Sequence, residues 1–253
     1  MIPLGVQLYS VRDQLTPDPD GVLRRLADLG YQFVEPTLGL LGGDPDGFRR
    51  LLHRHGLTAP SLHAPVLGPT RDEVADAARA IGAQTVVVAS IPATEFGTAA
   101  GVARCADRLT EAAADLARHG LGLAYHNHHW ELAERPGGQH ALELLAALLP
   151  EHIALELDLY WAATGGADVP ALLRRLGARV QFLHVKDGPA TLDAPMTAVG
   201  AGTLPIDAYL TAAAPGARRI VEIDRCAGDM LTALADSYAY LRGLSPAVLG
   251  GGR

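Results

Sequence analysis

Eight short β-type runs alternate with eight helical stretches along the whole chain. The runs occupy residues 4–9, 33–35, 58–63, 85–89, 121–126, 153–158, 180–185 and 219–223. Apolar residues recur with helical period over 20–29, 45–55, 70–81, 98–119, 138–149, 168–177, 205–214 and 229–242. Strands that are each followed by a helix form parallel sheets, and eight such units favour closure into a barrel. We therefore predict an α/β fold, a (β/α)8 TIM barrel.

The length fits a single domain. A barrel of eight units takes about 250 residues, and the chain has 253. No domain boundary is visible, so we expect one TIM-barrel domain over 1–253. An open, doubly wound sheet is the alternative, but it would carry a glycine-rich phosphate turn after its first strand. The turn from Tyr9 to Asp13 contains no glycine.

Charge and composition exclude several classes of protein. The net charge of −7 argues against a nucleic-acid groove, which needs a basic stripe. No apolar run approaches the length of a membrane span, and the N-terminus lacks the features of a signal peptide. Cys105 and Cys226 are the only cysteines, which fits a reducing compartment. We expect a soluble cytoplasmic monomer or homodimer with no nucleic-acid or membrane partner.

Polar residues gather where the predicted strands end. They are Glu35, His63, the segment from His126 to Glu131, Asp158, the segment from His184 to Asp187, and Glu222. Barrels of this architecture build their active sites at the carboxyl ends of the strands. These residues therefore predict an active site at that end of the barrel.

Carboxylate and imidazole groups at the ends of neighbouring strands predict a metal site. Three come from consecutive strands, namely Asp158, His184 and Glu222. We expect His126 as the fourth ligand, with His128 or Glu131 as alternatives, because the two-residue period of a strand puts His128 on the same side. A mixed carboxylate and imidazole set without thiolate suits Mn²⁺, Co²⁺, Zn²⁺ or Mg²⁺, and we favour Mn²⁺ or Co²⁺.

Each residue also has a simpler interpretation. A lone strand-end carboxylate is commonly a salt-bridge or helix-cap partner. Glu156 faces the same way as the expected strand-six ligand but lies deeper, so we expect it to pair with a neighbour. Lys186 either holds a substrate oxygen or pairs with Glu222 or Asp187. Trp130 either lines the pocket wall or packs within its loop.

Several motifs together resemble a known family. They are Gly5-Val-Gln-Leu-Tyr-Ser-Val-Arg12, Tyr125-His-Asn-His-His-Trp-Glu131, Leu157-Asp-Leu-Tyr-Trp161, His184-Val-Lys-Asp187 and Val221-Glu-Ile-Asp224. Over essentially the whole chain this order resembles the xylose isomerase-like TIM-barrel superfamily, and within it the sugar phosphate isomerase/epimerase branch.

The resemblance implies a divalent ion bound by a strand-five carboxylate, a strand-six Asp, a strand-seven His and a strand-eight Glu. The last three correspond to Asp158, His184 and Glu222. In ketose epimerases of the superfamily the strand-five Glu is both ligand and acid/base. This chain departs from that pattern, because His126 stands at the matching position and the nearest carboxylate is Glu131.

The function we expect is that of a metal-dependent isomerase or epimerase. Its substrate would be a sugar, polyol or related α-hydroxy-carbonyl compound, without phosphate because no glycine-rich phosphate loop is evident, and the reaction would pass through an enediolate. The expected catalytic residues are Glu222, Glu131 and His128, and the expected substrate-binding residues are Glu35, His63, Lys186 and Trp130.

Three other functions compete with it. A dehydratase or lyase acting on an inositol-derived or glycoside-derived ketone would use the same metal site. A sugar-binding barrel without catalysis is the non-enzymatic alternative. A phosphodiester endonuclease of the same superfamily would need more metal ligands and a basic surface, which the acidic charge disfavours.

Overall fold

Eight parallel strands form a nearly closed barrel in the computed structural model, which describes residues 2–244. The strands are β1 (Leu4–Gln7), β2 (Phe33–Glu35), β3 (Ser61–His63), β4 (Thr85–Val88), β5 (Gly122–His126), β6 (Ala154–Asp158), β7 (Val180–Val185) and β8 (Arg218–Val221). Their order around the sheet is β2-β1-β8-β7-β6-β5-β4-β3. The seam between β2 and β3 is held by few bonds, including those from Val34 N to Thr58 O (2.8 Å) and from His63 N to Pro36 O (2.9 Å). The predicted TIM barrel is confirmed.

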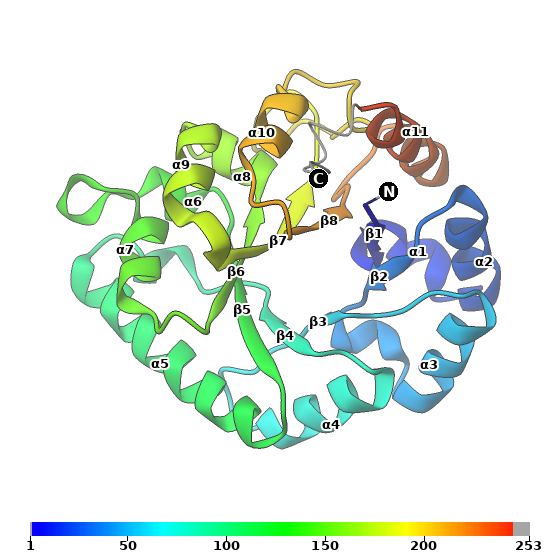
Figure 1. Cartoon of the computed structure of the whole chain (residues 1–253), viewed down its shortest axis with the longest axis horizontal. Coiled ribbons are helices and arrows are strands. Elements are labelled where there is room, and N and C mark those ends of the chain that lie inside the picture. The colour runs from blue at the N-terminus through cyan, green and yellow to red at the C-terminus, as the bar shows by residue number, and fades with distance from the viewer. Residues whose placement is uncertain (1, 245–253) are drawn as a thin grey trace.

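A ring of helices surrounds the strands (Figure 1). The longer ones are α2 (Pro19–Leu29), α3 (Pro45–Arg54), α4 (Arg71–Ile81), α5 (Ala99–Arg118), α7 (Ala141–Leu148), α9 (Val169–Leu176), α10 (Ile206–Ala212) and α11 (Met230–Gly243). Each corresponds to a stretch of predicted helical period. Their starts follow ordinary capping chemistry, since Asp18, Asp44 and Asp168 each accept a hydrogen bond from a backbone N–H of the first turn, with proline nearby.

Short helices that the periodicity did not predict follow the carboxyl ends of the strands. They are α1 (Arg12–Leu15), α6 (Trp130–Ala133) and α8 (Leu159–Thr164), together with the 3₁₀ turns η1 (Leu8–Val11), η2 (Leu38–Leu41), η3 (Ala93–Glu95) and η4 (Pro136–Gly138). One further 3₁₀ turn, η5 (Gly177–Arg179), comes directly before β7. Segments of three to six residues are too short to display a helical period. The first strand is shorter than predicted because the Gln7 side chain accepts a hydrogen bond from Tyr9 N (3.1 Å) and starts a 3₁₀ turn.

The barrel interior is apolar at one end and polar at the other. A separate cluster of buried side chains fills the end where the strands begin, and it consists of Phe33, Val87, Ala124, Ala154, Phe182 and Ile220. A much larger apolar cluster lies between the strands and the helices. Burial of this cluster contributes to the stability of the barrel. The polar residues described below lie toward the other end, where the strands stop.

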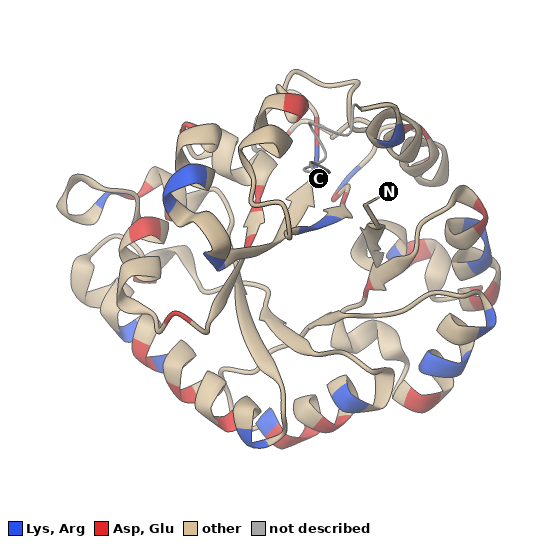
Figure 2. Ribbon diagram, in the orientation of Figure 1, with Lys and Arg blue, Asp and Glu red and all other residues tan. Residues whose placement is uncertain are grey.

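The outer surface carries charges of both signs. Acidic and basic residues are interspersed along the surrounding helices, with no single basic stripe in this view (Figure 2). Within residues 2–244, none of the helices combines the length and the apolar character that crossing a membrane requires.

Candidate metal centre

The strand period brings polar side chains from neighbouring strands to one level of the barrel. Asp158 on β6 is in register with His184 on β7. His126 on β5 is in register with Glu156, two residues before Asp158. Side chains two residues apart on a strand point to the same face, so two polar layers form, one above the other.

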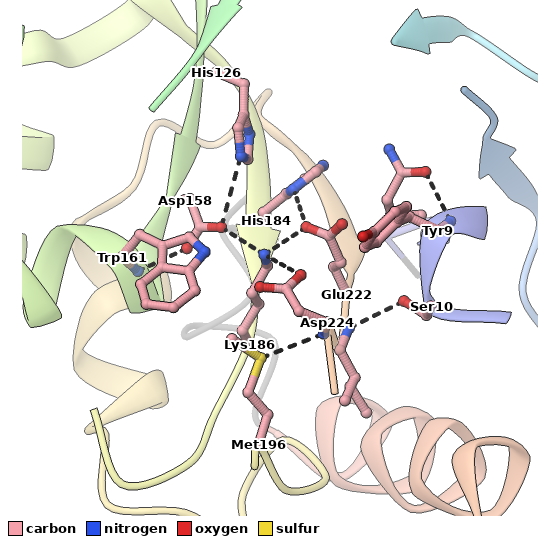
Figure 3. A network of polar contacts seen from close by, with 12 residues as sticks. Tyr9, Ser10, His126, Asp158, Trp161, His184, Lys186, Met196, Glu222 and Asp224 are labelled. Carbon is pink, nitrogen blue, oxygen red and sulfur yellow. Dashed lines mark hydrogen bonds and ion pairs between the residues drawn. The ribbon is translucent and has the colours of Figure 1, made fainter. Parts of the chain in front are cut away.

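The upper layer contains the four residues expected to bind a metal. His126, Asp158, His184 and Glu222 each offer a donor atom, and these atoms all lie within 4.8 Å of one another. His126 Nε2 is 3.8 Å from Asp158 Oδ2, and His184 Nδ1 is 2.7 Å from Glu222 Oε2. All four side chains are buried, and Figure 3 shows them converging. The structure thus brings together residues that are up to 96 positions apart in the sequence (222 minus 126).

Lys186 lies beside this quartet (Figure 3). Its Nζ is 2.9 Å from Asp158 Oδ2, 2.6 Å from Glu222 Oε2 and 2.8 Å from Asp224 Oδ1. Burial disfavours the lysine charge, but these carboxylates outweigh burial and hold its pKa well above the usual value. Of the two pairings that the sequence left open, the structure has the one with Glu222.

The neighbouring Asp187 has a different task. Its carboxylate accepts hydrogen bonds from the backbone N–H groups of Gly188, Gly200, Gly202 and Leu204. A Cβ added at Gly202 would lie only 2.0 Å from an oxygen of Asp187. Asp187 therefore holds the long loop after β7 in place and does not face the quartet.

The lower layer holds two buried glutamates that contact the histidines. Glu156 Oε2 lies 2.6 Å from His63 Nε2, 3.1 Å from His126 Nδ1 and 3.2 Å from His184 Nε2. Glu35 Oε1 lies 3.1 Å from His63 Nε2 and 2.8 Å from His184 Nε2. His126 and His184 thus turn one ring nitrogen toward the upper layer and the other toward a carboxylate below. Glu156 pairs with its neighbours, as expected.

The lower layer also perturbs the protonation of its members. Burial raises the pKa of Glu156 to about 7, and the nearby Glu35 adds to that shift. Burial lowers the pKa of His126 well below its usual value, helped by the positive charge of its neighbours. For His63, burial acts downward but is outweighed by Glu35 and Glu156, which raise its pKa to about 10.

Two properties of the cluster suit a divalent cation: its excess of carboxylates, and buried donor atoms that lack a well-formed hydrogen bond. Five buried or half-buried carboxylates outnumber the three cationic groups beside them. Asp158, Glu222 and Asp224 contact Lys186, and Glu35 and Glu156 contact His63 and His184, whose pKa values the carboxylates raise. Such an excess of buried negative charge is costly unless a cation balances it. Asp158 Oδ2 and His184 Nδ1 are buried without a hydrogen bond of acceptable geometry. Both atoms belong to the quartet, so the residues present suit a metal ion.

Glu35 and Glu131 lie where the sequence did not place them. Glu35, expected at the rim, is fully buried and accepts hydrogen bonds from Gln7 (2.9 Å) and from Ser61. Glu131, expected as a base, accepts one from the Tyr125 hydroxyl and one from His128 N (2.9 Å). Its side chain is fully buried and is absent from the cavity lining. Neither carboxylate reaches the mouth of the barrel.

A cavity of about 520 Å³ opens above the quartet. Among the expected residues, His63, His126, His128, Lys186 and Glu222 line it. Trp130 does not line it, because its ring stacks behind His128 with the ring centroids 4.3 Å apart.

Other residues of this lining were not predicted. They are Gln7, Tyr9, Arg12, Thr37, Ala89, Trp161, Leu192, Asp224 and Arg225. Gln7 could have been recognised from the sequence, because it is a polar residue at the end of a buried apolar strand. Asp224 stood in a recognised motif, but only the fold shows that it contacts Lys186.

Residues 23–214 match the sequence model of the family described as Xylose isomerase-like TIM barrel. The chain belongs to this family. The match confirms the resemblance that the strand-end motifs indicated. No curated protein matches the sequence significantly.

Solved structures of similar fold belong to proteins of several kinds. A sugar phosphate isomerase/epimerase from Parabacteroides distasonis ATCC 8503 is 22% identical, with a TM-score of 0.83 over 98% of this chain and 95% of that one. The probable 3-DHS dehydratase AsbF from Bacillus anthracis is 13% identical, with a TM-score of 0.76 over 96% and 100%. The IOLI protein with a binding zinc atom is 16% identical, with a TM-score of 0.70 over 99% of both chains. At these identities the likeness shows the shared barrel fold.

Proposed function

We propose that this xylose isomerase-like barrel is a divalent-metal-dependent isomerase or epimerase acting on an α-hydroxy-carbonyl compound derived from a sugar or polyol. The observation that carries the proposal is the convergence of His126, Asp158, His184 and Glu222 beneath a cavity of about 520 Å³. These four residues are the proposed metal ligands. The proposal draws further support from the isomerase/epimerase description of one structural neighbour and the zinc of another.

The chain's own residues supply binding and proton transfer. A divalent ion, when bound, polarises a carbonyl or hydroxyl oxygen and acidifies the adjacent C–H bond. His128 lines the cavity, and burial lowers its pKa to about 3, so the neutral imidazole is placed to hydrogen-bond a substrate hydroxyl or to take up its proton. Glu222 is the carboxylate base of the proposal, held in position by Lys186 and His184. Lys186 and Trp161 line the cavity and orient the substrate.

A dehydratase or lyase is the second candidate. The specific observation in its favour is that His126 stands where ketose epimerases of the family carry a second catalytic carboxylate. Glu131 does not replace that carboxylate, because Tyr125 and the His128 backbone hold it away from the cavity. A single carboxylate base, with no second carboxylate to return a proton to the opposite face, suits removal of a proton followed by loss of a β-oxygen substituent.

The test begins with removal of metal. We expect protein treated with a chelator to lose at least a hundredfold of its activity on a panel of ketoses, aldoses and aryl-substituted sugar ketones, and to regain it with Mn²⁺ or Co²⁺. Proton NMR in D₂O separates the two reactions. Isomerisation or epimerisation incorporates deuterium at the exchanged carbon and retains the carbon skeleton and its hydroxyls, whereas dehydration yields an unsaturated or deoxy product.

Two variants locate the metal. Asp158→Asn keeps the cap that Asp158 provides to Trp161 N but removes a charged ligand, and His184→Ala removes an imidazole. Both should lower metal occupancy, measured by elemental analysis, by at least tenfold. The matched controls Asp107→Asn and His53→Ala change exposed residues and should bind metal fully. Full occupancy in both site variants, or activity that resists chelation, would disprove the proposed centre.

A further inference from the structure

A second cavity, of about 600 Å³, lies beside the one above the quartet. It is built by the segments that follow β2, β3 and β4, with a contribution from Arg108 on α5. This end of the barrel is the end that carries active sites in the fold. None of the residues expected from the sequence explains it, apart from His63 at its border.

The walls of this second cavity are mainly apolar. They include Leu38, Val66, Leu67, Val88 and Ile91. Val66 and Ile91 are fully buried, whereas Leu38 and Leu67 are only partly buried and keep part of their apolar surface exposed. Although Thr37, His63, Thr70, Ser90 and Arg108 also line it, an apolar group would gain here by leaving water. We call this cavity the apolar chamber.

The apolar chamber adjoins the cavity above the quartet. Thr37, His63 and Ala89 line both. The His63 ring centroid is 5.4 Å from that of His126 and 5.5 Å from that of His184, so the shared wall directly adjoins the metal centre. A ligand that passes this shared border would therefore reach both cavities.

The two cavities differ mainly in the charged side chains that line them. The polar one is lined by charged side chains that include Arg12, Lys186, Glu222, Asp224 and Arg225. The apolar chamber is bordered by three prolines, which fix the backbone of its loops and reduce the entropy lost when a ligand binds. These prolines are Pro65, Pro69 and Pro92. The pair of cavities is suited to a ligand with one polar end and one apolar end.

We infer that the substrate carries an apolar substituent, such as an aryl group, next to its hydroxy-carbonyl unit, and that the apolar chamber binds this substituent. The inference rests on the proposed function, because it assigns the hydroxy-carbonyl unit to the cavity above the quartet. It adds the substrate class: a sugar-derived or polyol-derived ketone joined to an apolar group, in place of a free sugar.

Two hydroxamates serve as probes, since their adjacent carbonyl and hydroxyl oxygens imitate a hydroxy-carbonyl unit. Acetohydroxamate has only a methyl group to offer the chamber, whereas 3-phenylpropionohydroxamate carries an aryl group on a short linker. On the Mn²⁺-loaded protein, calorimetry should give a Kd at least tenfold lower for the aryl probe. Its binding should also show a more negative heat-capacity change, the marker of buried apolar surface.

Two variants fill the chamber. Ser90 and Leu67 line it without lining the polar cavity. Ser90→Phe and Leu67→Trp should each bring the ratio of the two dissociation constants to below threefold. The control Ala114→Phe places the same added bulk at an exposed position on α5 and should keep the tenfold ratio. A ratio below threefold in the unmodified protein, or a tenfold ratio that survives both filling variants, would overturn the inference.

A metal-free measurement separates this inference from the proposed function. In chelated protein, the fluorine NMR signal of 4-fluorophenyl β-D-glucopyranoside should broaden on binding, and Ser90→Phe and Leu67→Trp should abolish the broadening. If neither hydroxamate binds the Mn²⁺-loaded protein while the fluorine signal behaves as expected, the metal centre is wrong and the chamber stands. Absence of broadening in the unmodified protein counts against the chamber.

Discussion

At the scale of single residues, the orientation of two histidine rings decides what the centre can bind. His126 and His184 each face a buried carboxylate with one ring nitrogen and the quartet with the other. Metal-binding histidines commonly donate their second ring N–H to a carboxylate, which fixes the tautomer and the ring position. Glu156 contacts both rings, so we propose that it positions them. It is not itself one of the four proposed ligands.

Glu156→Gln tests that role. In the structure a single carboxylate oxygen, Oε2, contacts both rings. The amide retains the shape of the side chain but is neutral, so its oxygen accepts N–H groups from the two rings more weakly than a carboxylate oxygen does. We expect the affinity for Mn²⁺, measured by calorimetry, to fall by about 10–100-fold. Glu151→Gln is the control, since Glu151 is exposed on the approach to β6 and its change should leave affinity within threefold. An equally small effect of Glu156→Gln would rule out the positioning role.

At the scale of elements, the short helix α6 determines the direction in which the Glu131 side chain points. This helix turns the chain back after β5, so Glu131 meets the outward-facing Tyr125 and not the inward-facing His126. Burial raises the pKa of Glu131 to about 7, although the Tyr125 hydrogen bond acts in the opposite direction. The folded state therefore accommodates the protonated Glu131 at low pH and is destabilised when Glu131 is ionised.

Stability should depend on pH through this group. An unfolded Glu ionises near 4.5 and the folded one near 7, so the free energy of unfolding falls as the pH rises between these values, by on the order of 3 kcal/mol. Glu156 and Asp158 also have raised pKa values, so Glu131→Gln should reduce the total fall by this amount when urea unfolding is compared at pH 4.5 and pH 7. The exposed Glu134→Gln should retain it. Equal pH dependence in Glu131→Gln and in the unmodified protein would contradict the assignment.

At the scale of the whole molecule, the barrel separates stability from chemistry along its axis. The apolar cluster that includes Phe33, Phe182 and Ile220 fills the end where the strands begin, and the carboxylates and histidines occupy the other end. Because the two sets share no member, changes in one should act on the other only through the strands.

Phe182→Ala tests this separation. Removing a buried ring should lower the free energy of unfolding by about 3–5 kcal/mol, whereas Phe182→Leu should cost about 1 kcal/mol. Metal affinity of the folded protein should stay within threefold in both variants, as measured by calorimetry. A loss of metal affinity above tenfold in Phe182→Leu would show that the two ends are coupled.

The sequence determined the barrel and indicated the residues of the quartet, because both follow from local patterns. Eight runs of strand period, each followed by a helical period, specify the fold, and residues such as Asp158, His184 and Glu222 are recognisable by their position at strand ends. The structure confirms the barrel and brings the quartet together, while its metal-binding role remains a prediction.

Only the tertiary structure decided which way side chains outside the strands point. Glu131 and Trp130 follow β5 in a segment too short for any period to orient, and α6 turns both away from the cavity. The contacts of Glu35 and Glu156 with the same histidines depend on closure of the barrel, which joins strands distant in sequence. The apolar chamber likewise arises from three loops. Their shape depends on packing between elements, and no local pattern encodes it.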